Sequence, residues 1–349
     1  MLNDDSEFIA SARAAGLRYV KDTSPGIRRR GAGKGFFYLN QLGQRISDLK
    51  IINRIRQAVI PPAWTEVWIS PSPHGHIQAT GRDAKGRKQY RYHPKYRAVR
   101  DESKFERILE FSKVLPKIRQ HVERDLQRSC IDRCKMLAIV FYLLETTLIR
   151  VGNEEYARDN ESYGLTTLQA HHAKVKGGRI TFEFSGKSGV DHAISFTDHR
   201  LARIIQSCQD LPGEHLFQYK DDDGTFQSID SGDINGYLAS ITGGDFTAKD
   251  VRTWAGTMLA AVALRDFGIA SSKRDAEHNI RCALDQVANH LGNTRTVCLR
   301  YYVHPLVLKK YRVGQIINVP LTQKKYERKT PQAILRKDEV AVLNLLELH

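Results

Sequence analysis

The hydrophobic pattern of this chain of 349 residues changes character near residues 95–102, and that change constrains the fold more than any other feature. Before it, short β-like runs such as Gly35 to Leu39 and Glu66 to Ser70 alternate with segments rich in turn residues and proline. After it, apolar residues recur at three- and four-residue spacing over Phe105 to Gln127 and Ile131 to Val151. The first part therefore predicts strands, and the second predicts helices.

This pattern predicts an α+β protein with two domains of unequal size. We expect a small β-rich domain over residues 1–98, with one short helix over Ile51 to Ile60 that stops at Pro61-Pro62. A larger, mainly helical domain is expected over residues 99–349, because hydrophobic residues at 41% of the chain can bury a core of that size. Further helices are predicted over residues 198–209, 231–241, 247–267, 270–291, 294–303 and 330–349.

One stretch of the second part, His171 to Thr197, breaks the helical pattern. Gly177-Gly178 is a two-residue turn typical of a hairpin, and Ile180 to Phe184 follows it as a strand. A second turn leads to a third strand around Val190 to Phe196. We expect a three-stranded antiparallel sheet with Lys187 at the tip of its second turn.

The net charge of +15, from 54 Lys and Arg against 39 Asp and Glu, favours a polyanionic partner. Nucleic acid fits first and an anionic membrane surface second. The longest apolar run, Met136 to Leu144, is far shorter than the roughly 20 residues that span a bilayer. The acidic start MLNDDSEFIA lacks the order of a signal peptide, and five cysteines form no CxxC pair. These features predict a cytoplasmic protein.

Positive charge is most concentrated over residues 76–100, which hold eight Lys and Arg against one acid. Tyrosines interleave with these cations, as suits contacts to a nucleic-acid backbone. Arg28 to Arg30, beside a glycine-rich stretch, predict only a flexible basic loop, and Gly35 after Lys34 excludes a P-loop. Asp221 to Asp223 predict a solvated loop, and no cysteine and histidine spacing suits zinc. No metal and no cofactor is therefore expected.

Five segments, each weak alone, occur in an order and spacing that together are specific. They are Gly81 to His93, Leu148 to Leu165, Phe184 to His192, Phe246 to Trp254 and Leu291 to Pro305. The chain resembles the type IB DNA topoisomerases, in their bacterial, poxvirus-like branch. In that order, the segments resemble the duplex-contacting segment, the Arg-x-Gly-Asn helix, the lysine hairpin, the second arginine motif and the nucleophile motif. Lys187 follows Arg150 by 37 residues and Tyr302 follows Asn293 by 9, as suits that branch.

The resemblance implies relaxation of positive and negative supercoils by transient cleavage of one strand of double-stranded DNA, by a monomer, without ATP or metal. It implies the catalytic residues Arg150, Lys187, Arg252, Asn293 and Tyr302. It implies the DNA-binding residues Arg82, Lys85, Arg87, Tyr90, Arg91, Tyr92, Tyr156 and Lys249. The chemistry suits these types, because forked arginine donors stabilise a phosphate transition state and a lysine can protonate the leaving oxygen. Tyr302 then forms a 3′-phosphotyrosyl bond, which stores the energy for resealing.

Several alternatives stay open on the sequence. Tyr301 competes with Tyr302 as nucleophile, although the spacing from Asn293 favours Tyr302. Without the other motifs, Lys187 is typical of an ordinary lysine in a turn, and Arg252 is typical of a residue on a helix surface. Many relatives have histidine where Asn293 stands, so only a hydrogen-bonding role is expected there. A tyrosine recombinase shares this chemistry but usually shows His-x-x-Arg where this chain has Lys249-Asp250-Val251-Arg252. A non-catalytic basic DNA-binding protein is the remaining alternative.

Overall fold

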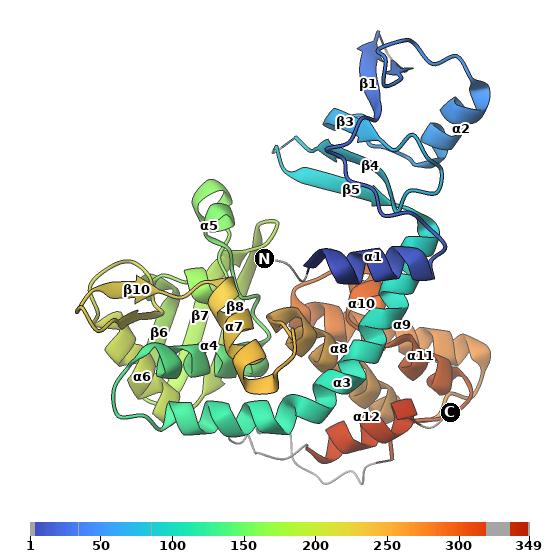
Figure 1. Cartoon of the computed structure of the whole chain (residues 1–349). Helices are drawn as coiled ribbons and strands as arrows, with labels where there is room; N and C mark the ends of the chain where they lie inside the picture. The colour runs from blue at the N-terminus through green and yellow to red at the C-terminus, as the bar shows by residue number, and fades with distance from the viewer. Residues whose placement is uncertain (1–3, 34, 85, 319–335, 348–349) are drawn as a thin grey trace. The chain divides into compact units, whose positions relative to one another are not determined.

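The computed structural model describes residues 4–33, 35–84, 86–318 and 336–347 (Figure 1). It has two compact units, residues 1–106 and 107–349, whose division falls inside helix α3 (Pro94–Leu126). The boundary that the sequence predicts at residue 98 lies in the first turns of the same helix and stays a prediction. The helix begins 11 residues before the predicted Phe105, because its charged and tyrosine-containing start carries no apolar periodicity.

The first unit is an antiparallel sheet of five strands in the order β2-β1-β3-β4-β5 (Figure 1). The strands are β1 (Ile27–Ala32), β2 (Gly35–Leu39), β3 (Thr65–Ile69), β4 (Ile77–Arg82) and β5 (Lys88–Tyr92). Ile55 of α2 (Leu49–Gln57) joins Val67 and Ile69 in the core on one face of this sheet. α1 (Asp4–Ala14) forms a second small core with Tyr96. The β-rich class predicted for the N-terminal part is confirmed.

The prediction of a flexible loop over Arg28 to Arg30 is wrong, because these residues lie inside strand β1 and form half of it. β1 pairs with both β2 and β3, so its backbone groups are used in the sheet. The side chain of Arg29 turns toward the chain after α2 and donates to the carbonyl oxygens of Pro61 (3.0 Å) and Trp64 (2.6 Å). Composition had suggested a loop, but the ladder on both sides of β1 overrides that local signal.

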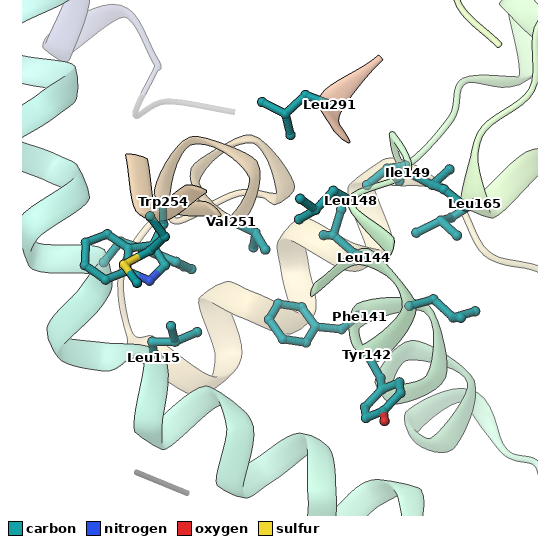
Figure 2. Packing of buried hydrophobic residues seen from close by; sticks show 14 of the residues in the cluster. Leu115, Phe141, Tyr142, Leu144, Leu148, Ile149, Leu165, Val251, Trp254 and Leu291 are labelled. Carbon is teal, nitrogen blue, oxygen red and sulfur yellow. The ribbon is translucent and has the colours of Figure 1, made fainter. Parts of the chain in front are cut away.

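The second unit is mainly helical, and α4 (Arg133–Thr147) lies in its core. Every residue from Met136 to Leu144 is buried, and the Asp132 side chain caps the helix by accepting from the backbone N–H of Lys135. Figure 2 shows Phe141 and Leu144 of α4 gathered with Val251 and with Leu148. Among the described residues, none of the helices is long and apolar enough to cross a membrane.

The predicted three-stranded sheet is confirmed as β6 (Ala173–Lys176), β7 (Arg179–Gly186) and β8 (Val190–Thr197), in that order. Ile180, Phe182 and Phe184 point inward from β7, as strand alternation requires. The three aspartates Asp221 to Asp223 follow β9 (Gln218–Lys220) in a hairpin with β10 (Phe226–Ser228), and the loop that contains them is solvated as predicted.

The remaining helices are α5 (Glu154–Asn160), α6 (His199–Gln209), α7 (Ser231–Thr242), α8 (Ala248–Phe267), α9 (Lys273–Leu291), α10 (Arg295–Tyr301), α11 (Pro305–Arg312) and α12 (Lys337–Glu347). Most of them follow the predicted order with ends shifted by a few residues, and α5 and α11 are two short helices that the sequence pattern did not predict. Short 3₁₀ turns cover Leu165–Thr167 and Ala170–His172. The helix predicted over residues 330–349 corresponds to α12 in part, and residues 330–335 and 348–349 lie outside the described residues.

Candidate active site

Arg150 stands just beyond the end of α4, where the chain turns sharply. Leu148 ends the helix in the left-handed region (φ 58°), and its N–H donates to the carbonyl of Leu144. The backbone carbonyl of Arg150 then accepts from the N–H of Leu165 (2.8 Å). A Cβ on Gly164 would lie 2.6 Å from that same carbonyl oxygen, so this position needs glycine. The glycines of this motif therefore fix the backbone that carries Arg150.

Arg252 lies in the second turn of α8, whose start is fixed by a capping box between Thr247 and Asp250. The arginine side chain is buried, with 4% of its surface exposed. Its Nη2 donates to the carbonyl of Leu291 (2.8 Å), and its Nε has no hydrogen-bond partner among the described residues. The surface-residue alternative for Arg252 is therefore wrong. Asp250 instead accepts from the N–H of Thr247.

The C-terminal end of α9 is the common anchor of both arginines. Arg150 Nη2 donates to the carbonyl of Gly292 (2.8 Å) and to Oδ1 of Asn293 (2.6 Å), one and two residues beyond the Leu291 carbonyl held by Arg252. Carbonyls at a helix C-terminus lack partners within the helix and carry partial negative charge. They hold the two guanidinium groups in place without neutralising them.

The electrostatic surroundings of the arginines favour an anion. Burial lowers the pKa of the Arg150 guanidinium, which Tyr302 and Cys298 partly oppose. Burial also lowers the pKa of Arg252, the neighbouring Arg150 adds to this, and Tyr302 opposes it. Both groups stay protonated at neutral pH, since arginine keeps its charge in proteins. Neither makes an ion pair with a carboxylate in the described part of the chain, so their charge is available to an anionic group.

Tyr302 is positioned through its backbone. It caps the C-terminus of α10, where its N–H donates to the carbonyl of Cys298 (3.0 Å). Its own carbonyl accepts from Oγ1 of Thr257 (3.3 Å), and a Cβ on Gly256 would lie 2.6 Å from that carbonyl oxygen. The Arg252 guanidinium lies 5.5 Å from the centre of the Tyr302 ring. Helix α8 thus carries both the second arginine and the backbone support of this tyrosine.

The neighbouring Tyr301 has different surroundings. It is the last residue of α10, and the guanidinium of Arg300, not of Arg252, lies over its ring at 5.3 Å. Tyr302 has a non-helical backbone (φ −128°), so the two side chains do not follow the spacing of one helix. This arrangement favours Tyr302 over Tyr301 as the residue beside the arginines, in agreement with the preference from the sequence.

Lys187 follows β7 in the turn that leads to β8, where the sequence predicts it. It is exposed, and it makes no hydrogen bond or ion pair with another residue in the described ranges. It lines a small pocket together with Arg150 and Arg252. The structure therefore brings together Arg150, Lys187 and Arg252 directly, with Asn293 and Tyr302 joined to them through the two arginines.

Two other predicted DNA-binding residues lie in this unit. Tyr156 is half-buried in the short helix α5, which Asn153 caps by accepting from the Tyr156 N–H (3.0 Å). Lys249 is exposed in the first turn of α8, three residues before Arg252. Their predicted contacts with DNA stay predictions.

The first unit divides its predicted DNA-binding residues between two faces of the sheet. Cross-strand register joins Arg28 to Trp68, Trp68 to Thr80 and Thr80 to Tyr90, so these residues share one face. The exposed members of this face are Arg28, Arg30, Arg82, Lys88, Tyr90 and Tyr92, which we call the basic sheet face. The rings of Tyr90 and Tyr92 stack with centroids 5.8 Å apart.

Arg91 lies on the opposite face, because strand alternation turns it toward the core that contains Ala79. Its guanidinium lies 5.7 Å from the Trp64 ring centre. Arg87 is exposed in the β4–β5 turn and pairs with Asp83 (2.7 Å). Tyr96, one of the tyrosines of the basic segment, is buried at 3% exposure beside α1. Lys85 lies outside the described residues.

Sequence reasoning assigned no role to two histidines that line the pocket, His192 and His290. His192 is the last residue of the lysine-hairpin motif, five positions after Lys187, and that proximity was the available signal. Among the described residues, no group of three or more His, Cys, Asp or Glu is arranged to hold a metal ion.

Comparison with known proteins identifies the family of the chain. Residues 93–329 match the family model described as eukaryotic DNA topoisomerase I, catalytic core, and residues 35–83 match bacterial DNA topoisomerase IB, N-terminal domain. The chain is 32% identical over 299 residues to the DNA topoisomerase 1B of Acanthamoeba polyphaga mimivirus, covering 84% of this chain and 89% of that protein. It is 26% identical over 252 residues to the DNA topoisomerase 1B of Vaccinia virus (strain Copenhagen), covering 68% and 74%.

The family models and the relatives identify an enzyme that breaks and rejoins DNA strands. The chain belongs to the type IB DNA topoisomerase family, in its poxvirus-like branch.

Proposed function

We propose that this topoisomerase relaxes positive and negative supercoils in double-stranded DNA through a covalent bond between Tyr302 and a 3′-phosphate. The observation that carries the proposal is the pair of arginines that meet at the end of α9 beside Tyr302. Both donate to backbone carbonyls, and neither has a carboxylate partner in the described ranges. Two fixed positive charges beside a nucleophile suit a phosphodiester, which gains negative charge density as it is attacked.

The proposed reaction starts when the Tyr302 hydroxyl attacks the phosphorus and its proton passes to water. A bond forms between the tyrosine oxygen and phosphorus, and the bond from phosphorus to the 5′-oxygen breaks. Arg150 and Arg252 donate to the non-bridging oxygens, where their forked N–H groups match the phosphate. The free 5′ end can then rotate, and its attack on the phosphotyrosine reverses the reaction. No ATP is needed, since the phosphotyrosine keeps the bond energy.

Lys187 is proposed to give a proton to the departing 5′-oxygen. An alkoxide is a poor leaving group, and general acids of this kind contribute about 10²–10⁴-fold. Its position in an exposed turn at the edge of the arginine pocket supports this role. Asn293 is proposed to hold Arg150 through its Oδ1. Its amide nitrogen donates to the Leu291 carbonyl (3.4 Å), and its second N–H is proposed to donate to the phosphate.

The basic sheet face, with Arg87, Tyr156 and Lys249, is proposed to bind the duplex. Exposed arginine, lysine and tyrosine side chains are the usual phosphate contacts of such proteins. We further propose that the enzyme acts as a monomer and associates with the nucleoid in the cytoplasm, which the net charge of +15 supports.

The test is relaxation of a supercoiled plasmid in EDTA without ATP, followed by single-turnover cleavage of two matched duplexes. One duplex has the ordinary 5′-oxygen at the scissile bond, and the other has a 5′-bridging sulfur, which leaves without a proton. Lys187→Ala is expected to slow cleavage of the first by about 10²-fold or more and largely to spare the second. Lys176→Ala, an exposed lysine on β6 of the same sheet, serves as the control.

Wild-type protein that leaves the plasmid supercoiled while still binding it would contradict the proposal and favour a recombinase or a non-catalytic binding protein. Equal losses by Lys187→Ala on both duplexes would contradict the general-acid role alone.

A further inference from the structure

His192 occupies the space between the lysine turn and the anchor of Arg150. A Cβ on Gly186, the residue just before Lys187, would lie 2.6 Å from Cδ2 of the His192 ring. A Cβ on Gly292 would lie 2.6 Å from Cε1 of the same ring. The Nε2 end of the imidazole therefore lies against both glycines. Its Cδ2 side faces the residue that leads into Lys187, and its Cε1 side faces the residue whose carbonyl accepts from Arg150 (2.8 Å).

The ring is held in that position by its strand. His192 lies opposite Phe184 in the β7–β8 ladder, and the two rings stack with centroids 5.0 Å apart and planes 21° apart. It makes no hydrogen bond or ion pair with any other described residue. The contacts of the ring are therefore van der Waals contacts.

We propose that His192 is a positioning residue that spaces the Lys187 turn from the end of α9 and so sets where the lysine amine reaches the phosphate. This inference rests on the proposed function, in which Lys187 is the general acid. The ring bridges two parts of the site: Gly186 at the base of the turn and Gly292 at the Arg150 anchor. A shift of about 1 Å in a reacting group can cost on the order of 10²-fold in rate.

A neutral ring suits this place. The charged groups around it are Arg150, Arg252, the adjacent Asp191 and Lys187 at the edge of the pocket, with His290 also lining it. Burial and the two arginines lower the pKa of His192, and Asp191 opposes them only weakly. An added cation here would compete with the arginines for their carbonyl anchors, whereas a neutral ring fills the space without doing so.

The first test uses the two duplexes described above, with ordinary oxygen and bridging sulfur at the 5′ position. His192→Ala is expected to slow cleavage of the oxygen duplex by about 10- to 30-fold and of the sulfur duplex by less than about 3-fold. His192→Gln, whose flat amide is close to the imidazole in length and volume, is expected to stay within about 3-fold of wild type on both duplexes. Equal losses on the two duplexes, or a His192→Gln variant as slow as His192→Ala, would overturn the proposal.

The second test is a double-mutant cycle with Gly186→Ala. The added methyl overlaps the His192 ring, and its next neighbour is the Val190 carbonyl at 3.4 Å, so His192→Ala makes room for it. Gly186→Ala is expected to slow the oxygen duplex about 10-fold in wild type and less than about 2-fold in the His192→Ala background. Losses that simply multiply would overturn the direct contact.

Gly178→Ala is the matched control. Its methyl would meet the ring of His199 at 2.4 Å, a similar overlap at the other end of the same sheet. This variant is expected to lose thermal stability without distinguishing between the two duplexes, and a selective loss on the oxygen duplex would overturn the proposal. The outcomes separate the two claims. If Lys187→Ala loses equally on both duplexes, the general-acid role fails; if it is selective and His192→Ala is not, only the role of His192 fails.

Discussion

The two units hold their cations in opposite ways. On the basic sheet face, Arg82 pairs with Glu66 (2.8 Å) and Lys88 with Asp22 (2.7 Å), and all but Asp22 are well exposed. In the catalytic unit, Arg150 and Arg252 are withdrawn from solvent and donate to backbone carbonyls. A surface ion pair contributes about 0–1 kcal/mol, so DNA phosphates can replace its carboxylate readily. A carbonyl anchor instead fixes a guanidinium without neutralising its charge, as the proposed contact with a reacting phosphate requires.

The same residue type is therefore held loosely on the proposed binding face and rigidly at the proposed reaction site. Added salt should therefore act mainly on the sheet, where charges are exposed and screened. Substitutions of Arg150, Arg252 or the residues that anchor them should act mainly on the rate of DNA cleavage.

The largest effect is expected from Arg252. Arg252→Ala and Arg252→Lys should each lower the single-turnover cleavage rate by about 10²–10³-fold, because lysine keeps the charge but not the forked donors. Duplex affinity, measured by fluorescence anisotropy, should change by less than about 3-fold, since the buried arginine is one of many phosphate contacts. Arg274→Ala, on the exposed side of α9, is the control. A loss confined to affinity would break the separation.

A smaller effect is expected from Arg82 on the sheet. Arg82→Ala should weaken duplex binding several-fold at low salt and reduce the slope of log affinity against log salt by about 1, since one phosphate contact is lost. Arg91→Ala should leave the slope unchanged, because Arg91 lies on the face toward the core. Binding titrations between low and moderate salt measure both slopes. An equal reduction by the two variants would contradict the assignment of faces.

The smallest effect is expected on protein stability at low pH, through His304, two residues after Tyr302. His304 caps α11 by accepting from the N–H of Leu306 (3.1 Å), and burial lowers its pKa to about 4. The unfolded chain binds this proton near pH 6.5, so stability is full above that pH and falls as pH drops toward 4. Between pH 7 and 5 wild type should lose about 1–2 kcal/mol through this group.

His304→Asn keeps a capping oxygen without titrating, so thermal unfolding of this variant should depend less on pH over the same interval. Moderate salt should have little effect on the difference in pH dependence between wild type and His304→Asn, because the His304 side chain is largely buried. A variant with the same pH dependence as wild type would contradict the role given to His304.

Much of this arrangement could be predicted from the sequence, and the exceptions have physical causes. The β7–β8 hairpin and its lysine followed from strand alternation and glycine turns, which are local signals. The β1 strand was missed because three arginines resemble a loop until strands on both sides pair with them. The burial of Arg252 was invisible because its anchor, the Leu291 carbonyl, lies 39 residues away. The position of His192 depends on Gly292, which only the folded chain brings near.

Within the basic segment of residues 76–100, distant contacts also decide which side chains are buried and which are exposed. Alternation could have separated Arg91 from Tyr90 and Tyr92, but the burial of Tyr96 depends on α1, far away in the sequence. Local pattern therefore predicted the elements and the residue types. Long-range contacts decided which side chains reach the site.

The central claim is that Tyr302 is the nucleophile beside the arginine pair. The most direct measurement is denaturation of the enzyme on a radiolabelled duplex, followed by mapping of the labelled peptide, for wild type, Tyr302→Phe and Tyr301→Phe. We predict a covalent adduct on Tyr302 in wild type and Tyr301→Phe, and none in a folded Tyr302→Phe that still binds DNA. An adduct that persists in Tyr302→Phe and maps to Tyr301 would contradict the account.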